Sequence, residues 1–382
     1  MDAMKVRGSI LLMGPLPPPL GGQSVLVKMI LESRLASRFR LIPFNIAHRN
    51  PGPARRALLT LGFLVRFFAT LIRHRRIRVL HIHSSAGIAL LEKGLYIAAG
   101  RVLGKRIVLH LHGGRLVPSW ENAGCLKKRL IKSLLNGCDQ MIVLSRSGAS
   151  FVADEIAPDT KIVLLPNAVE SVPALARPAA AGVTFLYVGH LKPEKGVLDL
   201  LEAFRLCLPH CEISLRIMGG GDTRANEQLV RAAYAEAGLA GVTFLGVLSG
   251  GEKWREFQAA DVFVLPSHSE DMPITVLEAM ACGLPVLSTC VGAIAEVIEQ
   301  GVNGYLVPPR DVHALADAMR LLAKNRHLRA AQGDANRLKI EREYSLDGYL
   351  QRLEGIYLSL LDGAPGDRTC RDGDATRVRQ GE

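Results

Sequence analysis

The sequence predicts an α/β protein of two doubly wound domains that face each other across a cleft, and three observations lead to that prediction. The chain has 382 residues, which exceeds the ~250–300 residues at which a single hydrophobic core stops growing. Short β-branched runs alternate with helix-length segments, as in parallel sheets built from βαβ units. The alternation stops once, in a Pro- and Ala-rich stretch at 166–182, and then begins again. A domain boundary is expected there.

The first domain is predicted at residues 1–170 and a linker at 171–182. Strands buried on both faces of a parallel sheet carry nearly continuous apolar runs, which is the pattern used here to find them. The expected strands are Ser9–Met13, Val79–Ile82, Arg106–Leu111, Gln140–Leu144 and Lys161–Leu164. Between the first two of these, one helix is expected to begin near Ser24 and another to cover Ala57–Ile72.

The second domain is predicted at residues 183–344. Its expected strands are Val183–Val188, Ser214–Met218, Val242–Leu245, Asp261–Leu265, Pro285–Ser288 and Tyr305–Val307. A C-terminal helix at 345–362 is expected to pack back toward the first domain. The tail at 363–382 is rich in Gly, Asp and Arg and is expected to be disordered.

Charge is divided unequally between the two halves of the chain. Residues 1–180 carry 26 basic and 9 acidic side chains, whereas residues 181–382 carry 21 and 27, within a net charge of +11. A basic half suggests nucleic acid, an anionic membrane surface or a phosphorylated substrate as partner. Aromatic residues are only 5% and no nucleic-acid-binding motif is found, so no nucleic-acid partner is expected.

The cysteines and the apolar segments predict a cytosolic protein. Seven scattered cysteines form no C-x-x-C pair, which is typical of reduced thiols that act as small buried hydrophobes. The apolar run Ser9–Met13 is too short for a signal peptide. The longest apolar stretch, Ala57–Ile72, is interrupted by Arg66 and is shorter than the ~20 residues that cross a bilayer.

The strongest local signal lies between Asp261 and Val286, where a strand, a polar loop, a helix and a further strand follow one another. Ligands of parallel sheets bind beyond the carboxyl ends of the strands, where the loop Ser267–Asp271 falls. Pro273 suits the first helical position, so the amides of Ile274 and Thr275 should point unpaired toward the cleft and attract a phosphate.

Two acidic residues flank the start of this predicted helix. Glu270 lies in the loop and Glu278 two turns into the helix, so they are presented at different depths and are not expected to share a proton. One of them can address a sugar while the other accepts hydrogen bonds from ribose hydroxyls. Both can also be solvated acids, which are favoured near helix N-termini in any case.

The segment from Glu270 to Glu278, with the Ala-Met-Ala-x-Gly-x-Pro-Val that follows it, resembles the hallmark of retaining glycosyltransferase family 4 (glycosyl transferases group 1). That family has the GT-B fold, in which two Rossmann-like domains face each other. Three further segments resemble family motifs in the family order and extend the resemblance from Gly14 to about Leu361. They are Tyr187–Gly196, Leu165–Glu170 and Gly301–Val307.

The resemblance implies roles for the charged residues of the second domain. Glu270 would face the donor sugar as a catalytic residue, Glu278 would bind the ribose, and Lys195 would clamp the donor diphosphate. The family has an Arg where this chain has His190, and a neutral imidazole is a weaker, pH-dependent partner for phosphate. Lys192 is a candidate for supplying the charge instead.

The resemblance also implies donor-binding roles for the residues around the helix start. Asp271 and Pro273 stand where the common form of the motif has glycines, which resembles a Pro-containing variant of the family. The implied donor-binding residues are Asp271, Met272, Pro273, Ile274 and Thr275, and backbone N–H donation, to which Pro273 cannot contribute, would survive such replacements.

In the first domain, Gly21 and Gly22 follow the first strand, and Ser24 is expected to cap the helix after them. A plain structural turn explains two adjacent glycines equally well; the resemblance implies a loop over the donor phosphates.

His81-Ile-His83 and His110-Leu-His112 each place two histidines on one strand face. A metal site is the obvious alternative, but hydrogen-bonded histidines at strand ends are preferred, so no metal is expected. His112 resembles the family histidine that contacts the donor sugar.

The helix at 57–72 carries a broad apolar stripe, and a basic segment follows it. One interpretation is a buried crossover helix. The other is docking onto anionic lipid, worth ~1 kcal/mol per basic residue near the surface. Arg73, Arg75, Arg76 and Arg78 are the candidate membrane- or acceptor-binding residues.

The resemblance implies a retaining glycosyltransferase that moves a sugar from a nucleotide diphosphate sugar to a hydroxyl acceptor. A glycan or lipid-linked acceptor of bacterial surface polysaccharide synthesis is expected, and the anionic inner face of the cell membrane is a possible partner. No D-x-D clamp is apparent, so no cofactor or metal is expected beyond the donor itself. A sugar-nucleotide epimerase of GT-B fold and a catalytically silent scaffold remain alternatives. A nicotinamide-dependent oxidoreductase is disfavoured because Met218–Asp222 is not G-x-G-x-x-G.

Overall fold

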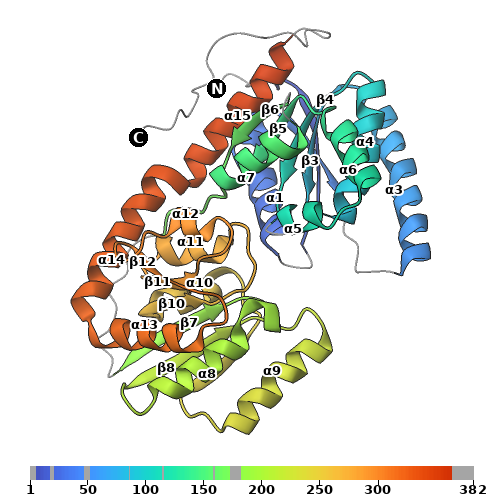
Figure 1. The fold of residues 1–382 in the computed structure, drawn as a ribbon. Helices are drawn as coiled ribbons and strands as arrows, with labels where there is room; N and C mark the ends of the chain where they lie inside the picture. The colour runs from blue at the N-terminus through green and yellow to red at the C-terminus, as the bar shows by residue number, and fades with distance from the viewer. Residues whose placement is uncertain are drawn as a thin grey trace.

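The computed structural model describes residues 6–17, 21–46, 52–85, 87–113, 116–157, 160–172 and 182–363, which form two α/β domains (Figure 1). Most of the predicted linker at 171–182 and all but Gly363 of the predicted disordered tail lie outside these residues.

The first domain contains a six-stranded parallel sheet in the order β2-β1-β3-β4-β5-β6. Its strands are β1 Ser9–Gly14, β2 Arg40–Asn45, β3 Ile77–Ser84, β4 Arg106–Leu111, β5 Gln140–Val143 and β6 Lys161–Leu164. Five of them match the predicted strands to within two residues at either end. The sixth, β2, was not predicted. It is an edge strand that contains Pro43 and exposes Arg40, so it lacks the apolar run of a buried strand.

The second domain contains a parallel sheet of the same size in the order β12-β11-β10-β7-β8-β9. Its strands are β7 Val183–Val188, β8 Ile213–Met218, β9 Val242–Gly246, β10 Val262–Leu265, β11 Val286–Thr289 and β12 Gly304–Val307. All six were predicted to within one residue at either end. The α/β architecture of two doubly wound domains is therefore confirmed.

Helices cover both faces of each sheet, and apolar side chains from sheet and helices form the cores. The first domain contributes α1 Gly22–Glu32, α2 Leu35–Arg38, α3 Pro53–Arg73, α4 Ile88–Val102, α5 Leu116–Glu121, α6 Cys125–Leu135, α7 Arg146–Phe151 and a π-helical turn at Val152–Ile156. The second contributes a 3₁₀ turn at Pro193–Lys195, α8 Val197–Cys207, α9 Arg224–Ala237, α10 Gly250–Ala259, α11 Ile274–Ala281, α12 Ile294–Val297, α13 Val312–Lys324, α14 Arg326–Lys339 and a π-helical turn at Ile340–Tyr344.

The last helix, α15 (Leu346–Asp362), follows the second domain in sequence but packs against the first sheet (Figure 1). Ser345 caps it by accepting a hydrogen bond from Gly348 N at 3.3 Å. Leu353 and Tyr357 of α15 are fully buried in one apolar cluster with residues of β1, β3 and α1. The same cluster includes Ile274 of α11, so it contains residues of both domains.

Helix α3 has apolar residues on two sides. Phe67 and Leu71 are buried in the first core, as a crossover helix requires. A second apolar face remains exposed along the length of the helix; it consists of Leu58, Leu61, Val65, Phe68 and Ile72, which are 42–70% exposed. No helix in the described part of the chain is both long enough and apolar enough to cross a membrane.

Candidate active site

The donor-side loop of the second domain leaves the carboxyl end of β10 and leads into α11. Buried hydroxyls hold it in place: Ser288 Oγ donates to Leu265 O at 2.6 Å, and Thr289 Oγ1 donates to Ser267 O at 2.5 Å. His268 N donates to Glu194 O at 2.9 Å, and the His268 ring lies 2.6 Å from Asp199 on α8. The loop is therefore fixed against the segment that carries Lys195.

Glu270 and Lys195, the two residues predicted to face the donor sugar and its diphosphate, form a close ion pair between Nζ and Oε1. Gly196 makes this approach possible, because its φ is +68° and a Cβ there would lie 1.8 Å from Pro266 O. The lysine and glutamate side chains are 20% and 10% exposed. The structure thus brings together two groups that are 75 residues apart in sequence.

The start of α11 lies one residue later than the sequence predicts. Pro273 is the N-cap in extended conformation, not the first helical residue, and α11 begins at Ile274. Val276 N donates to Pro273 O at 3.1 Å, so the amides of Ile274 and Thr275 are the first donors of the helix without a preceding carbonyl partner. The predicted phosphate-binding amides keep their place at the positive end of the helix dipole.

Glu278, the predicted ribose ligand, is 4% exposed inside α11. Its Oε1 lies 2.5 Å from Lys253 Nζ of α10, and no partner of its Oε2 is found among the described residues. Burial raises the pKa of this carboxyl, while Lys253 opposes the increase. The sequence did not single out Lys253, because a lysine in the first turn of an amphipathic helix carries no signal that separates it from solvated lysines.

His190 follows β7, and its backbone carbonyl accepts a hydrogen bond from Tyr187 OH at 2.9 Å. Burial, followed by the nearby Lys192 and Lys195, lowers the pKa of the imidazole, so His190 is neutral at pH 7. Lys192, the proposed substitute for the missing guanidinium, has its Nζ 3.6 Å from Asp222 Oδ2. The positive charge of Lys192 is therefore partly balanced by the carboxylate of Asp222.

On the first domain, Gly21 is the N-cap of α1 and Gly22 its first residue. Ser24 is the third helical residue, not the N-cap, and caps the helix through one half of a capping box. Its Oγ reaches back to accept from Gly21 N and to donate to Gly21 O, both at 2.9 Å, and thereby holds the glycine turn. A Cβ added at either glycine would meet no atom of the described residues within 4 Å.

The domains meet just after the carboxyl end of β4, at Gly113. Gly113 N donates to Asp271 Oδ2 at 2.7 Å, and nearby Asn167 Nδ2 donates to Met272 O at 2.7 Å. Burial raises the pKa of Asp271 to about 6; the Gly113 hydrogen bond lowers it, and the negative charges of Glu270 and Glu296 raise it. The backbone beside the predicted sugar-contacting histidine is therefore bonded to the donor-side loop.

The two histidine pairs lie on one face of the first sheet, as the sequence predicts, but they are inside the core. His81 Nδ1 lies 2.7 Å from Tyr357 OH, and His83 Nδ1 lies 2.9 Å from His112 Nε2. No partner of either ring nitrogen of His110 is found among the described residues. The ligand atoms of His81, His83 and His110 lie within 4.8 Å of one another, so this trio is the group of described residues that could hold a metal ion.

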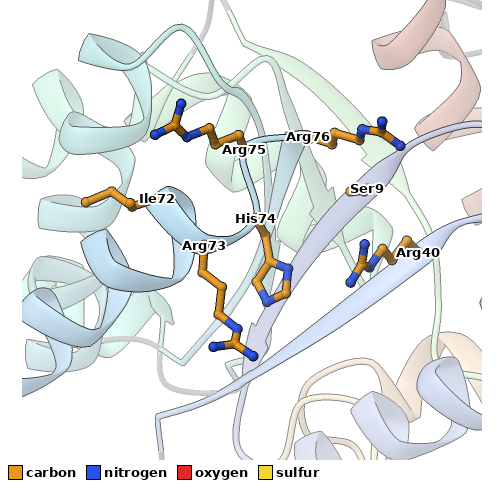
Figure 2. A pocket seen from close by; sticks show the side chains of 7 residues that line it. All are labelled: Ser9, Arg40, Ile72, Arg73, His74, Arg75 and Arg76. Carbon is orange, nitrogen blue, oxygen red and sulfur yellow. The ribbon is translucent and has the colours of Figure 1, made fainter.

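The predicted membrane- or acceptor-binding arginines are not part of this site. Arg73, Arg75 and Arg76 line a hollow of about 570 Å³ together with Arg40 and His74 (Figure 2). Arg40, Arg73 and His74 point toward one another there, while Arg75 and Arg76 extend to either side. The hollow lies at the amino ends of β1, β2 and β3, whereas the loops predicted to bind the donor lie at the carboxyl ends of strands. Arg78, the second residue of β3, is exposed and does not line the hollow.

Two family models match the chain, one for each domain. Residues 30–171 match Glycosyltransferase Family 4, and residues 179–339 match Glycosyl transferases group 1. Together the two models cover most of the chain.

Curated relatives match part of the chain. It is 28% identical over 235 residues to glycogen synthase from Mycobacterium tuberculosis (60% of this chain, 56% of the relative). It is 32% identical over 181 residues to O-antigen chain mannosyltransferase C from Escherichia coli (47% of each). It is 35% identical over 177 residues to phosphatidyl-myo-inositol mannosyltransferase from Mycobacterium leprae (44% of this chain, 46% of the relative). The chain thus spans about half the length of these relatives.

Solved structures match nearly the whole chain in fold. Sucrose-phosphate synthase from Thermosynechococcus elongatus superposes with a TM-score of 0.80 at 19% identity, covering 94% of this chain and 100% of that one. Anabaena HepE in complex with UDP-glucose gives 0.72 at 17% identity, covering 92% and 99%. The chain therefore belongs to the family 4 (group 1) glycosyltransferases and has their GT-B fold.

Proposed function

We propose that the protein is a retaining glycosyltransferase that moves a sugar from a nucleotide diphosphate sugar to a hydroxyl acceptor. One observation carries the proposal: the Lys195–Glu270 ion pair lies beside the N-terminus of α11, at the carboxyl edge of the second sheet. A cation, free helix amides and a carboxylate in one place suit a diphosphate joined to a sugar. The fold is shared with HepE, which binds UDP-glucose.

Donor binding replaces the ion pair between Lys195 and Glu270 with contacts from each of them to the donor. Without a donor, Lys195 and Glu270 neutralise each other. The donor diphosphate takes the place of the carboxylate at Lys195 and accepts from the amides of Ile274 and Thr275. Glu270 is thereby released to the sugar. Glu278, held at one oxygen by Lys253, accepts a ribose hydroxyl at the other.

The reaction proceeds by front-face displacement through an oxocarbenium-like transition state. The bond between the anomeric carbon and the diphosphate oxygen breaks, and the acceptor oxygen bonds to the same face of that carbon. The acceptor proton passes to the departing diphosphate. Lys195 and the positive end of the α11 dipole stabilise the negative charge that develops there, so the chemistry needs no metal ion or cofactor.

The acceptor is a lipid-linked glycan, and the first domain docks on the anionic inner face of a bacterial membrane. The exposed apolar face of α3, from Leu58 to Ile72, suits insertion between lipid headgroups. The adjoining hollow lined by Arg40, Arg73 and Arg76 suits lipid phosphates. Two relatives carry related names, an O-antigen chain mannosyltransferase and a phosphatidyl-myo-inositol mannosyltransferase. The product belongs to surface polysaccharide synthesis.

Donor screening and Glu270→Ala test the reaction. UDP- and GDP-sugars are screened by thermal shift, because a bound donor stabilises the fold by mass action. The donor found is then used to measure transfer and donor hydrolysis. Glu270→Ala is expected to lose transfer, whereas Glu202→Ala, an exposed acid on α8, is expected to keep it. Undiminished transfer by Glu270→Ala would refute the assignment.

Liposome flotation tests the membrane surface separately. With anionic vesicles, charge reversal at Arg73, Arg75, Arg76 and Arg78 is expected to abolish flotation, and Leu61→Ser with Val65→Ser to weaken it. A control reverses the same number of exposed charges on the second domain, at Arg255, Lys324, Arg326 and Arg342. Equal flotation of the wild type and the arginine variant would refute the proposed membrane docking. It would not affect the proposed transfer reaction.

A further inference from the structure

Four histidines stand together on one face of the first sheet, beneath the predicted sugar site. Side chains alternate between faces along a strand, so His81 and His83 of β3 share a face, as do His110 of β4 and His112 just after it. The parallel register places His83 directly opposite His110. All four are at most 9% exposed, and His112 is the least buried of them.

His83 and His112 share one hydrogen bond, between Nδ1 of His83 and Nε2 of His112 at 2.9 Å. Burial lowers the pKa of both rings far below neutrality, so both are neutral at pH 7 and a single proton lies between them. Because this bond occupies Nε2 of His112, Nδ1 is the nitrogen left for a ligand. Whether His83 donates or accepts in this bond therefore determines whether His112 Nδ1 is a donor or an acceptor toward a ligand.

The surroundings of His83 decide which ring donates. No partner of His83 Nε2 is found among the described residues, and the atom is fully buried. If His83 accepted the bond, its own proton would sit on Nε2 as a buried N–H without an acceptor, and such orphaned donors are rare in proteins. If His83 donates, Nε2 is an unprotonated nitrogen that only lacks a donor, which is the less costly arrangement.

We propose that His83 is a positioning residue for His112: it donates from Nδ1 to His112 Nε2 and so fixes the His112 proton on Nδ1, as a donor toward a sugar hydroxyl. This inference rests on the proposed glycosyl transfer and deepens it. A backbone bond from His112 N to Ser84 O at 2.8 Å holds the same residue from the other side. The sequence motif contains His112 alone, whereas its tautomer depends on a residue 29 positions earlier.

A metal ion is a poorer explanation of the cluster. The four rings stand within 31° of parallel in every contacting pair, so their lone pairs do not converge on one point. The trio of His81, His83 and His110 consists of neutral ligands without a carboxylate or thiolate, and burying a dication there is costly. Zinc content is nevertheless measured as an outcome of the test.

Substitutions at His83 and His81 separate positioning from packing. Asn places an amide N–H close to the position of Nδ1, so His83→Asn keeps the donor, whereas His83→Leu removes it. His81→Leu is the matched control, because His81 lies on the same strand and face and is equally buried, but bonds Tyr357 instead of His112. Thermal unfolding of all three variants reports the loss of packing.

The kinetic readout is kcat/KM for transfer from the donor. We expect His83→Leu to lose about tenfold or more, His83→Asn to stay within about threefold of wild type, and His81→Leu to change stability without changing kcat/KM. Equal kcat/KM for His83→Leu and wild type overturns the proposal, and so does an equal loss in His81→Leu.

A second readout is independent of activity. Nitrogen-15 NMR of histidine-labelled protein distinguishes a proton on Nδ1 from one on Nε2. His112 is expected to carry its proton on Nδ1 in the wild type and in His83→Asn. A proton on Nε2 of His112 in the wild type, or stoichiometric zinc in the purified protein, overturns the proposal. If no donor is ever found, the tautomer still decides this inference, so its failure is distinguishable from failure of the proposed function.

Discussion

Replacing Lys253 by Met would leave a buried carboxylate without its cation. Glu278 and Lys253 side chains are 5% and 21% exposed, and the atoms that join them are 2.5 Å apart. Removing one partner of a buried ion pair costs about 3–5 kcal/mol, because an uncompensated charge stays behind. Lys253 keeps some contact with water and Glu278 can take up a proton. We therefore expect a loss of about 2–4 kcal/mol at pH 7.

The pH dependence of this loss has a definite sign. Burial raises the pKa of Glu278, and Lys253→Met raises it further. A carboxyl with a raised folded pKa binds more protons in the folded chain than in the unfolded one. Stability therefore falls as pH rises from the ordinary Glu range of about 4 toward the folded pKa. The variant should differ most from wild type at neutral pH and least at about pH 4, where Glu278 is protonated in both states.

Thermal unfolding followed by the fluorescence of Trp254 measures the effect in the second domain, since Lys253 Nζ lies 5.3 Å from that indole ring. For a domain of this size a loss of 1 kcal/mol lowers Tm by about 2–4 °C, so a decrease of roughly 5–15 °C is expected. Lys324→Met, at an exposed lysine of α13, is the control, and Lys253→Met with Glu278→Gln should recover most of the loss. The reasoning is refuted if Lys253→Met leaves Tm unchanged at pH 7, or lowers it equally at pH 4.

Three further substitutions test other contacts of the site. The pKa of Asp271 is raised to about 6, so wild type should lose about 2–3 kcal/mol relative to Asp271→Asn as pH rises from 4 to 7, measured by urea unfolding. Gly196→Ala forces a Cβ toward Pro266 O at a φ of +68°, so donor KM should rise severalfold with the displaced Lys195 loop. Glu296→Ala removes the acceptor of Ser147 N and Ser147 Oγ and should speed hydrogen exchange at the start of α7.

Apolar runs were sufficient to predict the strands that are buried on both faces. Eleven of the twelve strands followed from them, because a doubly covered parallel strand carries apolar side chains in both directions. Strand β2 was not predicted because the face that carries Leu41, Pro43 and Asn45 is half-buried or exposed, and because Pro43 interrupts the apolar run. Helix α3 was predicted. Which of its two apolar sides would be buried was not predicted, because hydrophobic periodicity contains no information about the neighbouring elements.

Within the site, residues in a local motif were predictable and their distant partners were not. Glu270 and Lys195 each sit in a sequence pattern. Lys253 and Glu296 act through contacts made 25 and 149 residues away in the chain, and nothing in their own surroundings in the sequence marks them. The histidine pairs were assigned to one strand face correctly, but their union into one cluster depends on the register of β3 and β4.

Helix α11 links the donor site to the contact between the domains. Its first amides point to the predicted diphosphate, while the side chain of Ile274, 6% exposed, is buried in the apolar cluster of the first domain and α15. Asp271 and Met272, just before the helix, bond Gly113 and Asn167 of the first domain. Separating the domains would expose Ile274, which costs about 1.5–3 kcal/mol, and would break both hydrogen bonds. Because the same short segment carries the proposed donor contacts and the contacts with the other domain, we expect the proposed donor site to be complete only while the domains are in contact.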